Sequence, residues 1–269
     1  MTDTDEGRSI ELEVAVAGTP EQVWEAIATG PGISAWFVPT TVVGEPGGVM
    51  TQDFGPGMVV EGRVQAWEPP HRFSYGEHAE PTPGTMAFEF LVEARDGGTC
   101  VVRLVNSGFG SGAEWDGEYD ATENGWRIFL HILQLHLQRF AGQPAARVLA
   151  MGMHPGTEGA EAIWTAARAA LTAGGVTALT AGGDTVRTDG DTTPPLDGTV
   201  TLRANRALAF ALDGPASGTG LVAIEPHGGV TAVSLWLAFY GPDAEALAER
   251  DAPRWQAWVD ELIAGATAD

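Results

Sequence analysis

One long helical segment near the middle of the chain constrains the fold more than any other feature. Residues 120–141 place large apolar side chains at the spacing of a helix face: Trp126, Phe129, Leu130, Leu133, Leu137 and Phe140. Asp120 and Glu123 have the spacing of a capping box, and Gly142 suits the residue after the helix end. With a rise of about 1.5 Å per residue the predicted helix is about 30 Å long, which is enough to cross a whole sheet.

The residues before this segment predict one strand, two short helices and then a run of antiparallel strands. Residues 10–17 begin with alternating apolar and polar residues, and Thr19 to Gln22 suit a capping box with proline at the first helical position. Between residues 42 and 106, strand-like runs alternate with turn signals such as Asp96-Gly97-Gly98. Runs of strands flanked by helices favour an α+β fold, and we expect a curved antiparallel sheet around the long helix.

The second half of the chain repeats the order of the first half. Glu161 and Trp164 stand in a helical segment in the same way as Glu21 and Trp24. Strand-like runs and a final helix then follow in the same order, at residues 198–202, 209–212, 221–224, 231–239 and 252–264. We therefore predict two domains, residues 1–145 and a shorter, more divergent copy at residues 146–269. The alternative is a single domain with a long, unrelated C-terminal extension.

The charge of the chain excludes some classes of partner. The sequence has 36 acidic and 14 basic residues, a formal net charge of -22, and its basic residues are all arginine. Nucleic acids and anionic membrane surfaces are therefore poor candidates, because binding them requires clustered cations. Residues 1–8 lack the features of a secretory signal, and no apolar run approaches the length of a membrane span. We predict a cytoplasmic, acidic protein without membrane insertion, in which the single Cys100 is buried.

Short motifs in the first half resemble those of a known family. They are T-P-E-Q-V-W-E-A-I at 19–27, A-W-F at 35–37, G-R-V-Q-A-W-E-P-P-H-R-F-S-Y at 62–75, G-T-C-V-V-R-L at 98–104 and G-W at 125–126. With them, residues 10–141 resemble the SRPBCC (START-like) superfamily, in particular its AHSA type, named for activators of a heat-shock chaperone ATPase. The resemblance implies a helix-grip fold with a cavity between the sheet and the C-terminal helix. Relatives bind lipids, polyketides, sterols or plant hormones, some are cyclases or hydrolases, and only the namesake branch assists a chaperone.

Large apolar side chains of the first half are the candidate ligand-binding residues. Ligand sites of this kind are concave and mostly apolar, with few polar groups. The candidates are Trp36, Phe37, Phe54, Met58, Phe73, Tyr75, Phe88, Phe90, Trp126 and Phe129. The alternative is that these side chains simply fill the core.

Few residues suggest chemistry. Tyr75, His78, Arg103 and His131 are candidates to orient a ligand inside the cavity. His131 and His136 are five residues apart and would face different sides of a helix, so we predict neither a metal site nor a cofactor. The glycine-rich run at residues 108–112 lacks the pattern of a nucleotide-binding loop, and we interpret residues 108–119 as a lid loop.

These observations favour a protein that binds or carries a small hydrophobic ligand and is not an enzyme. One alternative is a cyclase, dehydratase or hydrolase acting on a polyketide-like substrate, which would need a titratable group inside the cavity. The other alternative is a co-chaperone-like interaction protein. Spacing identifies no catalytic residue and no oligomeric state.

Overall fold

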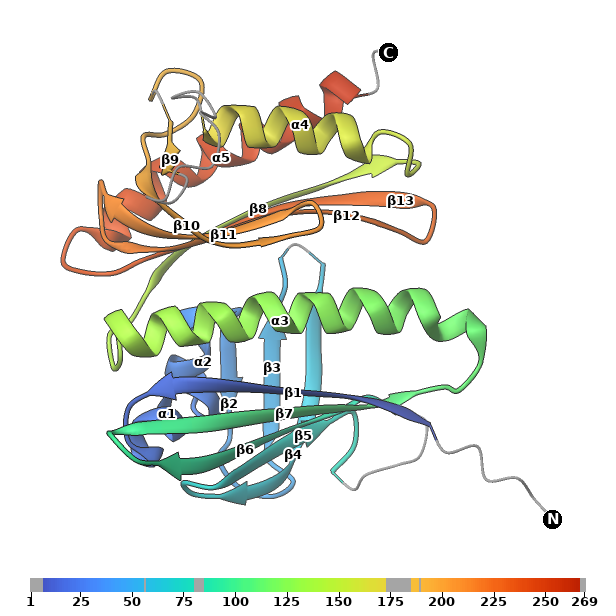
Figure 1. The fold of residues 1–269 in the computed structure, drawn as a ribbon, viewed down its shortest axis with the longest axis vertical. Coiled ribbons are helices and arrows are strands. Elements are labelled where there is room, and N and C mark those ends of the chain that lie inside the picture. The colour runs from blue at the N-terminus through green and yellow to red at the C-terminus, as the bar shows by residue number, and fades with distance from the viewer. Residues whose placement is uncertain (1–6, 56, 80–84, 173–184, 189, 267–269) are drawn as a thin grey trace. The chain divides into compact units, whose positions relative to one another are not determined.

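The computed structural model describes residues 7–55, 57–79, 85–172, 185–188 and 190–266 (Figure 1). It divides the chain into two compact units, Met1–Pro144 (unit 1) and Ala145–Asp269 (unit 2). Each unit combines one antiparallel sheet with helices, which confirms the predicted α+β class.

The described residues of unit 1 form a seven-stranded antiparallel sheet in the order β1-β7-β6-β5-β4-β3-β2. Its strands are β1 (Arg8–Ala17), β2 (Thr40–Val42), β3 (Val49–Asp53), β4 (Val59–Glu68), β5 (Arg72–Gly76), β6 (Ala87–Arg95) and β7 (Thr99–Phe109). Neighbours along the chain pair as hairpins from β2 to β7, and β1 joins the far side of β7. This order places the first and last strands side by side, below helix α3 in Figure 1.

Two short helices, α1 (Pro20–Ala28) and α2 (Gly30–Trp36), connect β1 to β2. The predicted capping box of α1 is confirmed: Gln22 N–H donates to the Thr19 hydroxyl, and Thr19 N–H donates to Gln22 Oε1. The indole N–H of Trp36 donates to Ala26 O at 2.8 Å, which ties α2 to α1. Together the two helices bring the chain to the start of β2 and fix the position of the residue after α2, Phe37.

The long helix α3 (Asp116–Arg139) is present, but it begins one turn before the predicted start. A 3₁₀ turn, η1 (Ala113–Trp115), leads directly into it, and no side chain caps its first turn. The predicted cap at Asp120 is therefore wrong, because that residue is already inside the helix. The predicted lid loop is shorter for the same reason, since β7 continues to Phe109 and residues 113–119 are helical.

Unit 2 repeats this arrangement, as the sequence predicts. Its strands are β8 (Ala146–Pro155), β9 (Thr185–Arg187), β10 (Asp197–Ala204), β11 (Ala207–Gly214), β12 (Gly218–His227) and β13 (Val230–Phe239). They are ordered β8-β13-β12-β11-β10-β9, so β8 and β13 take the places of β1 and β7. Helix α4 (Ala160–Leu171) follows β8 as α1 follows β1, and Trp164, like Trp24, is buried.

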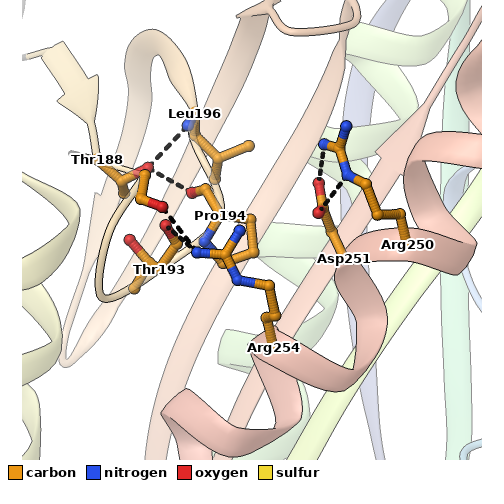
Figure 2. A network of polar contacts seen from close by, with 8 residues as sticks. Thr188, Thr193, Pro194, Leu196, Arg250, Asp251 and Arg254 are labelled. Atoms are coloured by element: carbon orange, nitrogen blue, oxygen red, sulfur yellow. Dashed lines mark hydrogen bonds and ion pairs between the residues drawn. The ribbon is translucent and has the colours of Figure 1, made fainter.

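The last helix, α5 (Ala244–Ala266), is longer than the predicted residues 252–264. The additional residues precede the predicted start, so Pro253 lies inside the helix. Figure 2 shows polar contacts that α5 makes within unit 2. Asp251, only 1% exposed, accepts two hydrogen bonds from Arg250, while Arg254 Nη2 donates to the carbonyl oxygens of Gly190 and Thr193. Two hydrogen bonds hold the connection between β9 and β10 together. The Thr188 hydroxyl donates to Pro194 O, and Leu196 N–H donates to the Thr188 hydroxyl.

Candidate functional site

Nine of the ten candidate ligand-binding residues come together in unit 1. We call them the aromatic cluster: Trp36, Phe37, Phe54, Phe73, Tyr75, Phe88, Phe90, Trp126 and Phe129. Strands β5 and β6 contribute two rings each in register, since Phe73 pairs with Phe90 and Tyr75 with Phe88. Helix α3, the last residue of α2 and the segments that follow α2 and β3 supply the others. The predicted residues therefore share one face of the sheet and the helix that crosses it.

Phe37 and Trp126 connect the parts of the cluster. The Phe37 ring lies 4.6 Å from that of Phe129, 5.5 Å from Trp126 and 5.8 Å from Phe54, measured between centroids. Trp126 in turn contacts Phe88 at 5.7 Å and Phe90 at 6.0 Å. The contacts form one continuous network, in which offset and edge-on ring pairs are favourable.

Two tryptophans that the sequence analysis did not select extend this network. Trp24 and Trp67 lie 5.1 Å apart, and both contact the Phe73 ring. Both occur in the motifs that carry the family resemblance, so they could have been chosen from the same signal.

Met58 lies apart from the cluster. Its side chain is 55% exposed in the turn between β3 and β4, and Val60 in the following strand is 52% exposed. Val60 pairs directly with Gln52 of β3, so the two side chains lie on the same face of the sheet. We call Met58 and Val60 the rim. Phe54, in the same connection, is partly exposed and contacts Phe37, which links the rim to the cluster.

One buried amide in this region lacks a hydrogen-bond partner. Gln52 is 7% exposed, and its Nε2 atom has no partner among the described residues. The amide lies beside the hydroxyl of Tyr75. Burial raises the pKa of Tyr75 well above its ordinary value, and the neighbouring Gln52 side chain opposes this only in part, so the phenol keeps its proton at neutral pH. A buried donor without a hydrogen-bond partner lowers the free energy of unfolding by about 1–3 kcal/mol, so the burial of the Gln52 amide needs an explanation.

A second buried amide shows the opposite situation. Asn106 of β7 is fully buried and pairs with Phe88 across the sheet. Its Nδ2 atom donates to Ala87 O at 3.2 Å, and its Oδ1 atom accepts from the indole N–H of Trp126 at 3.3 Å. Asn106 therefore fixes Trp126 against the sheet. The sequence analysis missed both amides, which lie at apolar-facing strand positions.

The other proposed orienting residues lie outside the cluster. His78 and Arg103 are exposed. His131 is partly buried on α3, and burial lowers its pKa. Of the four, only Tyr75 is part of the cluster.

Two hollows of unit 1 lie elsewhere. One, of about 460 Å³, lies against the opposite face of the sheet, beside Ser74 and Glu89, and Phe88 borders it. The arginine in the lining of this hollow, Arg72, forms ion pairs with Glu89 and Glu68, and these carboxylates raise the pKa of the Arg72 guanidinium group. The other, of about 380 Å³, lies between α1, α2 and the end of α3, with Glu21 and Glu25 in its lining.

The described residues contain no group of three histidine, cysteine, aspartate or glutamate side chains placed to hold a metal ion. None of their helices combines the length and apolar character that a membrane span needs.

Comparisons with known proteins give one family match and several similar solved structures. Residues 17–138 match the family model described as activator of Hsp90 ATPase homolog 1-like protein. No curated protein matches the chain. A solved structure from Mesorhizobium loti is 23% identical, with a TM-score of 0.43, over 49% of this chain and 98% of that one.

Two other similar structures extend over both units. The di-domain ARO/CYC protein BexL of the BE-7585A biosynthetic pathway is 16% identical over 97% of this chain and 95% of its own, with a TM-score of 0.43. DynU16, from the dynemicin biosynthetic locus, is 18% identical over 97% of this chain and 99% of its own, with a TM-score of 0.42. Residues 17–138 therefore match the AHSA1 family model, and unit 2 repeats the strand order of unit 1, with β8 and β13 in the places of β1 and β7.

Proposed function

We propose that the aromatic cluster of unit 1 binds and holds a small hydrophobic molecule. The observation that carries this proposal is the continuity of the apolar surface from the interior to solvent. Phe73 is fully buried, Phe54 and Phe129 are partly exposed, and the rim residues Met58 and Val60 are more than half exposed. A guest that covers such a surface gains about 25 cal/mol for each Å² of apolar area removed from water.

The electrostatic character of the region favours a neutral guest. No side chain of the aromatic cluster or the rim is a cation, and the chain carries a formal net charge of -22. An anion would lose its hydration there without gaining a positive partner. A neutral aromatic or polycyclic molecule would contact the rings and lose little on leaving water.

Equilibrium binding of 2-isopropenylnaphthalene, followed by quenching of tryptophan fluorescence, tests the proposal. We expect the wild type to bind it, and the double variant Met58→Asp/Val60→Asp to bind at least fivefold more weakly, because charge at the rim opposes an apolar guest. The matched control is Val43→Asp/Met153→Asp, which adds the same charge at equally exposed positions, 51% and 59%, and should bind like the wild type. Equal binding by all three proteins, or no binding by the wild type, would contradict the proposal.

An inward-facing acid favours one second candidate, an enzyme acting on a polyketide-like substrate. Tyr75 keeps its proton inside the cluster and is therefore a group that could polarise a ketone. Heptane-2,4,6-trione, which loses one water on cyclisation, is a simple probe. Acceleration by the wild type that is lost in Tyr75→Phe, while binding of 2-isopropenylnaphthalene is retained, would support catalysis. If the wild type does not accelerate the cyclisation, catalysis is contradicted and hydrophobic binding stays as the proposed function.

A further inference from the structure

The buried amide of Gln52 points to one chemical feature of the guest. We infer that Gln52 Nε2 recognises a neutral hydrogen-bond acceptor, such as a ketone, ester or ether oxygen, at the inner end of an otherwise apolar ligand. This inference rests on the proposed function and adds a ligand class to it.

Gln52 occupies an inward position of strand β3. Along β3 the side chains alternate, with Met50 and Gln52 buried and Val49 and Asp53 exposed. The inward positions of such a strand ordinarily take apolar residues. A glutamine here places an amide on the face where Met50 is apolar and the opposite residue, Val60, is a rim residue.

Neither strand partner of Gln52 uses its nitrogen. Thr40, its partner on β2, donates its hydroxyl to Val38 O at 2.8 Å. Val60, its partner on β4, has an apolar side chain. Nε2 has no hydrogen-bond partner among the described residues, whereas the equally buried Asn106 has its amide fully engaged. The two amides therefore differ: Asn106 is bonded on both sides within the fold, whereas the Gln52 nitrogen has only the Tyr75 hydroxyl beside it and forms no hydrogen bond of good geometry among the described residues.

The groups around the Gln52 amide favour an uncharged acceptor. The Gln52 amide and the Tyr75 hydroxyl beside it are both uncharged donors, set among rings. Two such donors suit an oxygen with partial negative charge. A carboxylate would need a cation or several more donors before it could leave water.

Three naphthalene derivatives of one size test the inference on the full chain. 2-Acetylnaphthalene carries a ketone oxygen, 2-isopropenylnaphthalene replaces that oxygen by a CH₂ group, and 2-naphthoate carries a charge. We expect the ketone to bind the wild type about tenfold more tightly than the hydrocarbon, because its oxygen accepts one hydrogen bond from a buried donor. We expect 2-naphthoate to bind most weakly.

The decisive variant is Gln52→Met, which keeps the length of the side chain and removes the donor. It should bring the ratio of ketone to hydrocarbon affinity to about one, while the hydrocarbon affinity stays within twofold of wild type, which also reports an intact site. Gln138→Leu, at an exposed position of α3, is the matched control and should keep the tenfold ratio.

Each other outcome counts against a defined claim. Equal affinity of the wild type for ketone and hydrocarbon, or an unchanged ratio in Gln52→Met, would overturn the inference and leave hydrophobic binding intact. If 2-naphthoate binds most tightly of the three probes, the inference that the acceptor is neutral is wrong. If none of the three probes binds the wild type, the proposed function fails and the inference fails with it.

Discussion

Two buried amides on one sheet face show how single residues divide between fold and function. Asn106 saturates its hydrogen bonds with Ala87 and Trp126, so its burial is compensated within the protein. Gln52 is also buried, but its Nε2 atom has no hydrogen-bond partner among the described residues. Such a group is uncommon in a folded protein and needs a reason, and the ligand acceptor proposed above supplies one.

The unliganded protein should reflect this difference in its stability. We expect Gln52→Met to raise the free energy of unfolding by about 1 kcal/mol, because an unpaired buried donor is replaced by an apolar group of similar shape. Asn106→Leu should lower it by about 1–3 kcal/mol, because Trp126 N–H and Ala87 O lose their partner. Urea denaturation of both variants beside the wild type gives the comparison. A Gln52→Met protein less stable than Asn106→Leu would show that Gln52 is an ordinary core residue.

Burial of tyrosine hydroxyl groups predicts an alkaline limit of stability. Burial raises the pKa values of Tyr75 and Tyr240 above the ordinary value of a tyrosine, so the folded state keeps protons that the unfolded state releases. Their contribution is complete below pH 10 and is lost as the pH rises further, because the unfolded state then binds fewer protons. Denaturation between pH 8 and pH 11 should show a falling free energy of unfolding, with a shallower slope in Tyr75→Phe. A slope that Tyr75→Phe leaves unchanged would contradict this account.

At the scale of elements, periodicity predicted most of the structure and failed at helix ends. The inward residues of β5, β6 and α3 were identified because alternation and helical spacing follow directly from strand and helix geometry. The start of α3 was misplaced, because Asp116 to Tyr119 are polar or small and carry no apolar repeat, although Arg8 binds Asp116 and Tyr119 O–H donates to Ser9 O. Those contacts join β1 to α3 across the fold, and local sequence does not report them.

Helix α5 provides a test of how one element holds a connection in place. Arg254 donates to carbonyl oxygens of Gly190 and Thr193, which precede β10. Arg254→Met keeps the aliphatic stem and removes these bonds, so amide hydrogen exchange in residues 190–196 should accelerate at least tenfold. The loss of global stability should be small, about 1 kcal/mol or less, since the side chain is exposed.

Arg168→Met, an exposed substitution on α4, is the control for this experiment and should leave exchange in residues 190–196 unchanged. Equal exchange in Arg254→Met and the wild type would show that the connection is held by Thr188 and its neighbours alone.

At the scale of the whole molecule, the order of elements carried the prediction of a repeated fold. Weak individual matches between the halves became persuasive because they occur in one sequence order, and the two sheets have that order. The site was harder to predict. The burial of Gln52 depends on the pairing of β3 with β2 and β4, and the exposure of Met58 depends on where the hairpin turns. Both are tertiary properties that a pattern along one strand does not contain.

The compactness of the two units leads to a prediction about folding. Each unit has its own sheet and its own helices, so we propose that a chain ending at Pro144 folds alone. Circular dichroism and thermal denaturation of residues 1–144 should show a cooperative transition. A molten or unfolded spectrum would mean that unit 1 depends on the rest of the chain.

The most direct measurement of the central claim is a titration of the full chain with 2-acetylnaphthalene, followed by ¹⁵N–¹H NMR of the indole N–H groups. The chain has nine tryptophans, which single Trp→Phe variants would assign. The account predicts that the signals of Trp126 and Trp36 move with the ligand, together with the side-chain amide of Gln52, while those of Trp164 and Trp255 in unit 2 stay in place. Movement confined to the tryptophans of unit 2, or no movement at all, would contradict it.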